Sequence, residues 1–204
     1  MKLRPVILSL AVACALPMLA QASNLAKAYP TGELIDKPMI MTKFVEFSNA
    51  RTPPELIFND RQGQPVSMDQ HQGKLVLINI WASWCGPCIK EIPALRQLEQ
   101  QFSDKPVKVV PVSIDDLSSD EVYQVLANYQ LQHIDSLFDR GHAMNGVMPV
   151  NVVPATYVLD SNGNLVGFAR GYLDWQDPQV APYMAQLIDK YTHIGVASST
   201  EDQH

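Results

Sequence analysis

Cysteine is scarce in this chain, with three residues among 204, at Cys14, Cys85 and Cys88. Cys14 lies in the apolar N-terminal segment, so the rest of the chain has one pair. A framework of several structural disulfides, typical of small secreted domains, needs more cysteines than this. A zinc site is excluded as well, because two thiolates without a second pair of ligands do not complete a tetrahedral site.

Other ligand patterns are also missing. The five histidines are scattered without metal-ligand spacing, at His71, His133, His142, His193 and His204. Cys88 is followed by Ile89 rather than by a histidine, which excludes haem attachment through this cysteine pair. We therefore expect neither a metal nor a separate cofactor.

An excess of basic charge is absent too, since the net charge is −6 at pH 7. Nucleic acid and anionic membrane surfaces are therefore not expected as partners. Beyond the N-terminal segment the sequence has no apolar stretch long enough to span a bilayer, no repeat and no low-complexity tract. The length and the 47% hydrophobic content fit a single globular core.

The first 22 residues have the pattern of a secretory signal. Lys2 and Arg4 precede an apolar stretch at residues 6–15, and small residues form a cleavage site that ends at Ala22. Cleavage after Ala22 predicts an exported, periplasmic protein that has lost Cys14. Two alternatives stay open: acylation of Cys14, as in a lipoprotein, and an uncleaved signal that anchors the chain in the membrane.

The most informative motif is Trp84-Cys85-Gly86-Pro87-Cys88, which directly follows the apolar run 75–81. A strand that leads into a Cys-x-x-Cys turn at the start of a helix is the layout of a dithiol redox site. At the helix N-terminus, Cys85 faces unpaired backbone N–H groups and the positive end of the helix dipole, which favour the thiolate. The motif predicts Cys85 as the nucleophile and Cys88 as the resolving thiol.

A disulfide between Cys85 and Cys88 is expected to be functional rather than structural. Disulfides in an oxidising compartment are usually structural. A bridge across two residues, however, closes so small a loop that it constrains the unfolded chain little. The spacing therefore favours a redox-active disulfide.

Hydrophobic patterns predict the elements that follow residue 54. We expect a hairpin from strands at 56–58 and 66–68, a buried strand at 75–81, and the helix that holds the thiols. Then come a strand at 107–114, a helix at about 119–131, a short helix at 141–146, strands at 156–159 and 164–169, and a helix at 177–194. This order predicts an α/β domain over residues 55–194, with a mixed sheet and helices on both faces.

Helix caps, one proline and the two ends of the chain give further expectations. Ser118 and Glu121 have the spacing of a capping box for the helix at 119–131, and Asp177 is a candidate cap for the last helix. Pro111 lacks a backbone N–H, which predicts either a bulge or an unpaired N–H side in its strand. Residues 23–54 are the least patterned and are interpreted as an N-terminal extension with one candidate strand at 44–47. Residues 195–204 are interpreted as a flexible tail.

The cysteine motif and its surroundings resemble exported thioredoxin-fold proteins of the TlpA/ResA type. The resemblance rests on residues 77–93, which contain the motif and Ile89-Lys90-Glu91-Ile92-Pro93, and on residues 152–160 with Pro154. It covers residues 56–194. It implies a thioredoxin-like fold with an N-terminal β-hairpin extension, and with the helix at 119–131 as a central insert.

The resemblance also implies roles for further residues. Pro154 would be a cis-proline beside the disulfide, and Val153 would offer its backbone to an extended substrate. Glu91 would accept a proton near the thiols, in place of the buried acid that cytoplasmic thioredoxins have where this chain has Asn79. Without the resemblance, an ordinary trans-proline and a solvated surface charge are the alternatives for Pro154 and Glu91.

The segment around the thiols is the expected substrate-binding surface. Trp84 is expected to contribute an apolar docking surface beside the disulfide, together with Gly86 and Pro87. Trp81 is expected either here or in the core.

The resulting functional expectation is a periplasmic thiol–disulfide oxidoreductase that reduces protein disulfides. Such a reductase needs electrons from a membrane thiol donor, because an oxidising compartment does not supply them. Candidate substrates are apocytochrome c thiols, copper-site cysteines of respiratory assembly factors and misoxidised proteins. The alternatives are a thiol oxidase or isomerase, and a copper carrier that uses the same dithiol.

Overall fold

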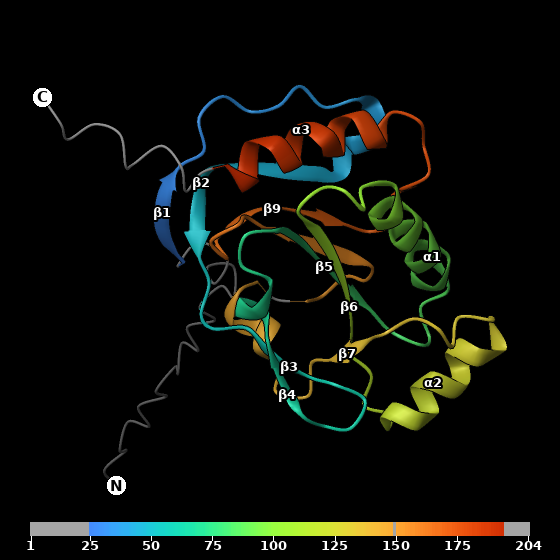
Figure 1. The fold of residues 1–204 in the computed structure, drawn as a ribbon. Helices are drawn as coiled ribbons and strands as arrows, with labels where there is room; N and C mark the ends of the chain where they lie inside the picture. Colours follow the sequence, from blue (N-terminus) through green and yellow to red (C-terminus); the bar gives the residue numbers. More distant parts are fainter. Residues whose placement is uncertain (1–24, 149, 194–204) are drawn as a thin grey trace, which may run out of the picture.

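The computed structural model describes residues 25–148 and 150–193 (Figure 1). The predicted signal at 1–22, Cys14, His204 and the predicted tail at 195–204 lie outside these residues. The elements, in chain order, are β1 (Ala26–Pro30), η1 (Met39–Lys43), β2 (Phe44–Thr52), β3 (Ile57–Asn59), β4 (Pro65–Ser67), η2 (Met68–His71), β5 (Leu75–Trp81), α1 (Gly86–Gln101), β6 (Val107–Ser113), α2 (Ser119–Asn128), β7 (Leu137–Phe138), η3 (Ala143–Gly146), β8 (Ala155–Leu159), β9 (Leu165–Arg170) and α3 (Val180–Thr192).

The strands form one mixed sheet in the order β1-β2-β9-β8-β5-β6-β7-β3-β4. Strand β6 pairs in parallel with both β5 and β7, and β5 pairs antiparallel with β8. All seven residues of β5 are buried, because the strand has a neighbour on each side and a packed layer on each face. The predicted mixed sheet is confirmed.

The two faces of β5 pack against different layers. Leu75 and Leu77 point to a core that includes residues of α1 and α3. Val76, Ile78 and Ile80 point the other way, to a core that includes Met68 of η2 and Met144 of η3. Figure 1 shows α1 and α3 above the sheet, with the blue turn η1 beside α3, and the teal and orange turns η2 and η3 below it. The prediction of helices on both faces is confirmed. The layer opposite α1 and α3 consists of the short 3-10 turns η2 and η3.

The sheet continues into the segment interpreted as an N-terminal extension. Strand β2 pairs antiparallel with β9, in a register that places Phe44 opposite Ala169, and β1 pairs with β2 at the edge. The candidate strand at 44–47 is confirmed and runs on to Thr52. Residues 26–52 therefore share the hydrogen-bonded sheet that contains β5.

Local signals in the sequence located several elements correctly. The predicted hairpin is present as β3 and β4, with Phe58 opposite Val66. The Ser118 side chain accepts a hydrogen bond from the Glu121 backbone N–H, and the Glu121 carboxylate accepts one from the Ser118 N–H. This capping box begins α2 at the predicted position.

Two helix boundaries were predicted wrongly. Helix α2 ends at Asn128 rather than near Leu131, because Gln130 adopts a positive φ of 62° that breaks the helical path. Helix α3 begins at Val180 rather than at Asp177. The Asp177 side chain accepts a hydrogen bond from the Gln179 N–H and so closes a turn before the helix instead of capping it.

Strand β7 was not predicted, and it explains how Pro111 fits into β6. Pro111 pairs in register with Asn79 of β5, without a bulge. On the other side β7 starts opposite Val112, one residue further on. The N–H side of Pro111 is therefore unpaired in the ladder, which is the second of the two predicted solutions.

A substitution at Gly167 tests the contact between β2 and β9. A Cβ at this position would lie 2.6 Å from the Val45 carbonyl oxygen and 2.7 Å from the Phe44 ring. We expect Gly167→Ala to lower the free energy of unfolding by about 1–3 kcal/mol through overpacking. Urea denaturation measures the change. Gly141→Ala, where a Cβ would meet nothing within 4 Å, is the control, and an equal loss in both variants would contradict this reading.

Candidate active site

The two cysteines lie where β5 leads into α1. Cys85 is the N-cap of α1, and its sulfur accepts a hydrogen bond from the Cys88 N–H at 3.3 Å. Pro87 occupies the first turn, where a missing N–H removes no helical hydrogen bond. The thiols therefore lie at the positive end of the helix dipole, as predicted.

Cys85 and Cys88 form a disulfide with a Cα–Cα distance of 5.3 Å. Both residues are buried, Cys88 completely. Trp84, Gly86 and Pro87 around them are exposed, and 71% of the Trp84 surface is accessible. Trp81, by contrast, is a core residue whose indole N–H donates to the Ser136 hydroxyl at 2.9 Å.

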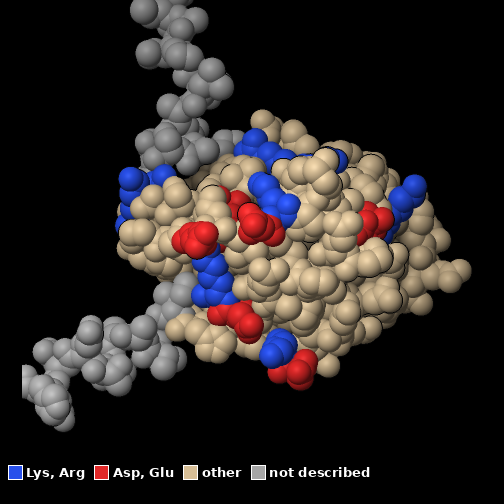
Figure 2. Space-filling view, turned by 90° about the horizontal axis from the view of Figure 1, so that it is seen from above, with Lys and Arg blue, Asp and Glu red and all other residues tan. Residues whose placement is uncertain are grey.

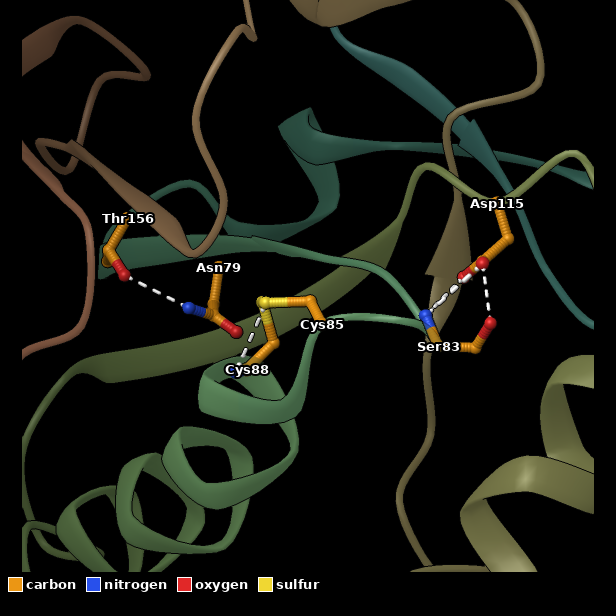
Figure 3. The surroundings of a disulfide bond; sticks show 6 residues. All are labelled: Asn79, Ser83, Cys85, Cys88, Asp115 and Thr156. Carbon is orange, nitrogen blue, oxygen red and sulfur yellow. Dashed lines mark hydrogen bonds between the residues drawn. A yellow bond between two sulfur atoms is a disulfide. The ribbon is translucent and has the colours of Figure 1, made fainter.

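Asp115 holds the loop that precedes Cys85 (Figure 3). Its carboxylate accepts hydrogen bonds from the Ser83 backbone N–H at 2.9 Å and from the Ser83 hydroxyl at 2.7 Å. A third bond comes from the Ser113 hydroxyl at 2.7 Å. Asp115 lies two residues after the end of β6, the parallel neighbour of β5, so it lies at the same end of the strands as the thiols. These bonds fix the backbone two residues before Cys85.

The Val153–Pro154 peptide bond is cis, as the resemblance implied. Pro154 is buried directly before β8, and its carbonyl oxygen accepts a hydrogen bond from the Gly171 N–H at 2.8 Å. The half-buried Val153 side chain packs against the cluster that contains both cysteines. The structure therefore brings residues 153–154 to the disulfide.

Glu91 lies one turn after Cys88 on α1 and is buried, with 1% of its surface exposed. It is not the solvated surface charge that was the alternative. Its Oε1 accepts a hydrogen bond from the indole N–H of Trp175, and its Oε2 is buried without a partner in the structure. Asn79 lies on β5, where its amide donates to the Thr156 hydroxyl at 3.1 Å while its Oδ1 also lacks a partner (Figure 3).

Burial raises the pKa of Glu91 from 4.5 to about 7. The low-dielectric surroundings disfavour the charged carboxylate. The Trp175 hydrogen bond, the polar backbone of Leu173, the Asn79 amide and the positive charge of Lys43 oppose this rise only in part. A carboxyl group with such a pKa gains and loses a proton near neutral pH, which suits a proton acceptor.

Two residues of this site were not predicted from the sequence. Trp175 lies 84 positions after Glu91, in the loop that follows β9, and no local pattern connects the two. Asp115 could have been found, because a polar residue directly after a buried strand, next to the strand that leads to the thiols, is expected near them.

The family of this chain follows from its sequence match. A family model described as Redoxin matches residues 43–187. The chain belongs to the Redoxin family. The matched range includes both cysteines, Glu91, the cis-proline and Trp175, and it begins inside the segment interpreted as an extension.

Individual Redoxin relatives are similar at lower coverage. The chain is 26% identical over 113 residues to thiol-disulfide oxidoreductase ResA of Bacillus thuringiensis (strain Al Hakam), covering 55% of this chain and 64% of ResA. It therefore spans less than two thirds of that protein. It is 30% identical over 122 residues to thioredoxin-like protein YneN of Bacillus subtilis (strain 168), covering 59% of this chain and 71% of YneN.

Solved structures share the fold. The thioredoxin domain of a thiol-disulfide oxidoreductase from Bacteroides vulgatus aligns with a TM-score of 0.54 at 21% identity, over 67% of this chain and 94% of that domain. A secreted thiol-disulfide isomerase from Corynebacterium glutamicum aligns with a TM-score of 0.57 at 15% identity, over 78% of this chain and 98% of that protein. The thioredoxin-like fold is confirmed.

The described part of the chain has neither a metal-ligand cluster nor a membrane-spanning helix. Within residues 25–148 and 150–193, no group of three or more His, Cys, Asp or Glu side chains is placed to hold a metal ion. In the same part of the chain, no helix is both long enough and apolar enough to cross a bilayer.

The raised pKa of Glu91 predicts a pH-dependent stability. The folded protein binds this proton more tightly than the unfolded chain, so the stabilisation is complete below the unfolded pKa and is lost as pH rises through about 7. We expect wild type to lose up to about 3 kcal/mol relative to Glu91→Gln between about pH 4 and pH 8. Urea denaturation of the oxidised proteins measures the difference. The exposed Glu55→Gln is the control, and a flat difference between Glu91→Gln and wild type would show that Glu91 keeps an ordinary pKa.

Proposed function

We propose that this protein is a thiol–disulfide oxidoreductase that reduces disulfides in exported proteins. The observation that supports this most is the combination of a dithiol at a helix N-terminus with a buried carboxyl group one turn further on, whose pKa is raised to about 7. The names of the ResA relatives and of the oxidoreductase from Bacteroides vulgatus support the same activity.

The reduction proceeds in two exchange steps. The Cys85 thiolate attacks one sulfur of the substrate disulfide, forms a mixed disulfide and releases the first substrate thiolate, which takes a proton. Cys88 then loses its proton and attacks the Cys85 sulfur, which releases the second substrate thiolate. Two electrons pass from the dithiol to the substrate, and the Cys85–Cys88 disulfide remains.

Glu91 assists the second step. Cys88 is completely buried and needs a nearby base before it can act as a thiolate. Glu91 lies three residues along the same helix, and its raised pKa allows it to take the proton at neutral pH. Protonation removes the negative charge of a buried carboxylate whose Oε2 has no hydrogen-bond partner, so burial favours uptake of the proton.

The substrate docks on an apolar surface at the ends of the strands, beside the disulfide. Four exposed apolar side chains follow or precede strands at the end where the disulfide lies: Trp84, Leu117, Val152 and Tyr172. An extended segment of a protein substrate pairs with the backbone at Val153 and packs its side chains on this surface.

On the face that contains α3, acidic and basic side chains are interspersed between wide uncharged areas (Figure 2).

The direction of electron flow is part of the proposal. The signal-like N-terminus supports a periplasmic location, and in that compartment a membrane thiol donor would reduce Cys85–Cys88 again after each cycle. Apocytochrome c thiols, copper-site cysteines of respiratory assembly factors and misoxidised proteins remain the candidate substrates.

A second candidate function has one supporting observation. The similar structure from Corynebacterium glutamicum is named a secreted isomerase, so an isomerase or oxidase that uses the same cysteines is the main alternative. A copper carrier would need tight Cu(I) binding by the dithiol together with poor disulfide exchange.

Trapping of the mixed disulfide tests the exchange mechanism. Cys88→Ser removes the resolving thiol, so substrates should accumulate as disulfide adducts on Cys85. Non-reducing gels and mass spectrometry of a periplasmic extract detect these adducts. Cys85→Ser is the matched control and should trap nothing. Equal adduct levels in the two variants would refute the assignment of Cys85 as the nucleophile.

The reduction potential of Cys85–Cys88 tests the direction. A reductase should have a potential near about −250 mV or lower, whereas an oxidant lies near about −120 mV. Equilibration of the purified domain with dithiothreitol or glutathione buffers, followed by Trp fluorescence, gives the value. A potential near that of an oxidant would overturn the reductase assignment while leaving the exchange chemistry intact.

A further inference from the structure

The loop at residues 171–175 is the cover over Glu91, and its position determines the surroundings of the carboxyl group. Trp175, at its end, donates the indole hydrogen bond to Glu91. Leu173 in the same loop is buried, and its polar backbone lowers the pKa of Glu91. Displacement of this loop would remove the Trp175 donor from the carboxyl group.

Lys43, at the end of η1, holds this loop. Its ammonium group donates a hydrogen bond to the Tyr172 carbonyl oxygen at 2.9 Å. It also lies 4.0 Å from the position that a Cβ would take on Gly171. Lys43 and Tyr172 are 129 residues apart in sequence, so the contact exists only because β2 pairs with β9.

The backbone around Lys43 is firmly placed. Phe44 follows it in β2, is buried, and pairs with Ala169 of β9, three residues before Tyr172. Two residues further on, the Glu46 carboxylate accepts hydrogen bonds from Lys190 at 2.6 Å and from the Tyr191 hydroxyl at 2.5 Å, both on α3. The Lys43 ammonium group therefore reaches the loop from a residue directly before an anchored strand.

The charged and titratable groups around Glu91 come from three elements. On α1 they are Cys88 and Cys85, which are neutral in the disulfide and titrate after reduction. In the loop the group is Tyr172, on which the carboxylates of Glu91 and Asp174 both act. From the N-terminal extension comes Lys43, the cation whose charge favours the ionised form of Glu91. Asn79 on β5 is neutral.

We propose that the N-terminal extension completes the proton-accepting site: Lys43 fixes the loop at 171–175 over Glu91 and supplies the positive charge that faces its carboxylate. Lys43 is a positioning residue, because it acts through Glu91 and not on the thiols. The role of Lys43 in catalysis rests on the proposed function. Its effect on Glu91 does not depend on that function.

The expected consequence follows from electrostatics. Removing a nearby cation makes the carboxylate less favourable and raises the pH at which Glu91 loses its proton. At neutral pH a smaller fraction of Glu91 is then ionised and able to accept the Cys88 proton, so resolution of the mixed disulfide slows.

The test compares Lys43→Met with Lys43→Arg. Carbon-13 NMR of the Glu91 side-chain carboxyl in the oxidised full-length protein reports its titration directly, without any substrate. We expect the midpoint to rise by about 0.5 pH unit or more in Lys43→Met, the size of a partly screened charge interaction, and to return toward wild type in Lys43→Arg. The Trp175 indole resonance should shift in Lys43→Met, since the loop loses its anchor.

Lys37→Met is the matched control. Lys37 lies in the same segment and also donates to a backbone carbonyl, that of Phe44 at 2.8 Å, so its loss tests whether any anchor of the extension has the same effect. An unchanged Glu91 midpoint in Lys43→Met, or an equal shift in Lys37→Met, would overturn the proposal. If wild type has no reductase activity but Lys43→Met still shifts the Glu91 midpoint, the proposed function is refuted. The proposed role of Lys43 at Glu91 then still holds.

Discussion

Strand β5 is buried along its whole length, and the position of the reactive groups depends on that burial. The strand ends at Trp81 inside the core, and the chain must then turn at once into α1, so both cysteines lie at a helix N-terminus. The same burial places Asn79 and Glu91 in low-dielectric surroundings beside this turn. The tendency of the site to hold a proton near neutral pH is thus a consequence of the packing that stabilises the sheet.

The site is assembled from segments that are far apart in sequence. Asp115 after β6 fixes the loop before Cys85, the cis-proline before β8 lies beside the thiol cluster, and Trp175 after β9 reaches Glu91. These segments meet because strands β5, β6, β8 and β9 place their connecting loops at one edge of the sheet. Each segment contributes polar or backbone contacts, and none forms the site alone.

Much of this could be predicted from the sequence. The Cys85–Cys88 motif, the buried strand before it and the capping box at Ser118 are local signals, and each was located correctly. Strand β7 has two residues, too few to show a periodic pattern, and was missed. The extension was difficult to read because its strand β2 is defined by pairing with β9, which lies more than a hundred residues away.

The sequence by itself determined the chemistry available: one pair of thiols with two residues between them, the helix dipole that favours a Cys85 thiolate, and an acid one turn away. Local chain geometry is enough for these, since helix periodicity places residues 85, 88 and 91 on neighbouring turns. The tertiary structure alone decided that Glu91 is buried, that Trp175 donates to it and that Lys43 lies within reach of its covering loop. Burial and long-range contacts depend on how the strands pair, and a pattern of neighbouring residues does not contain that information.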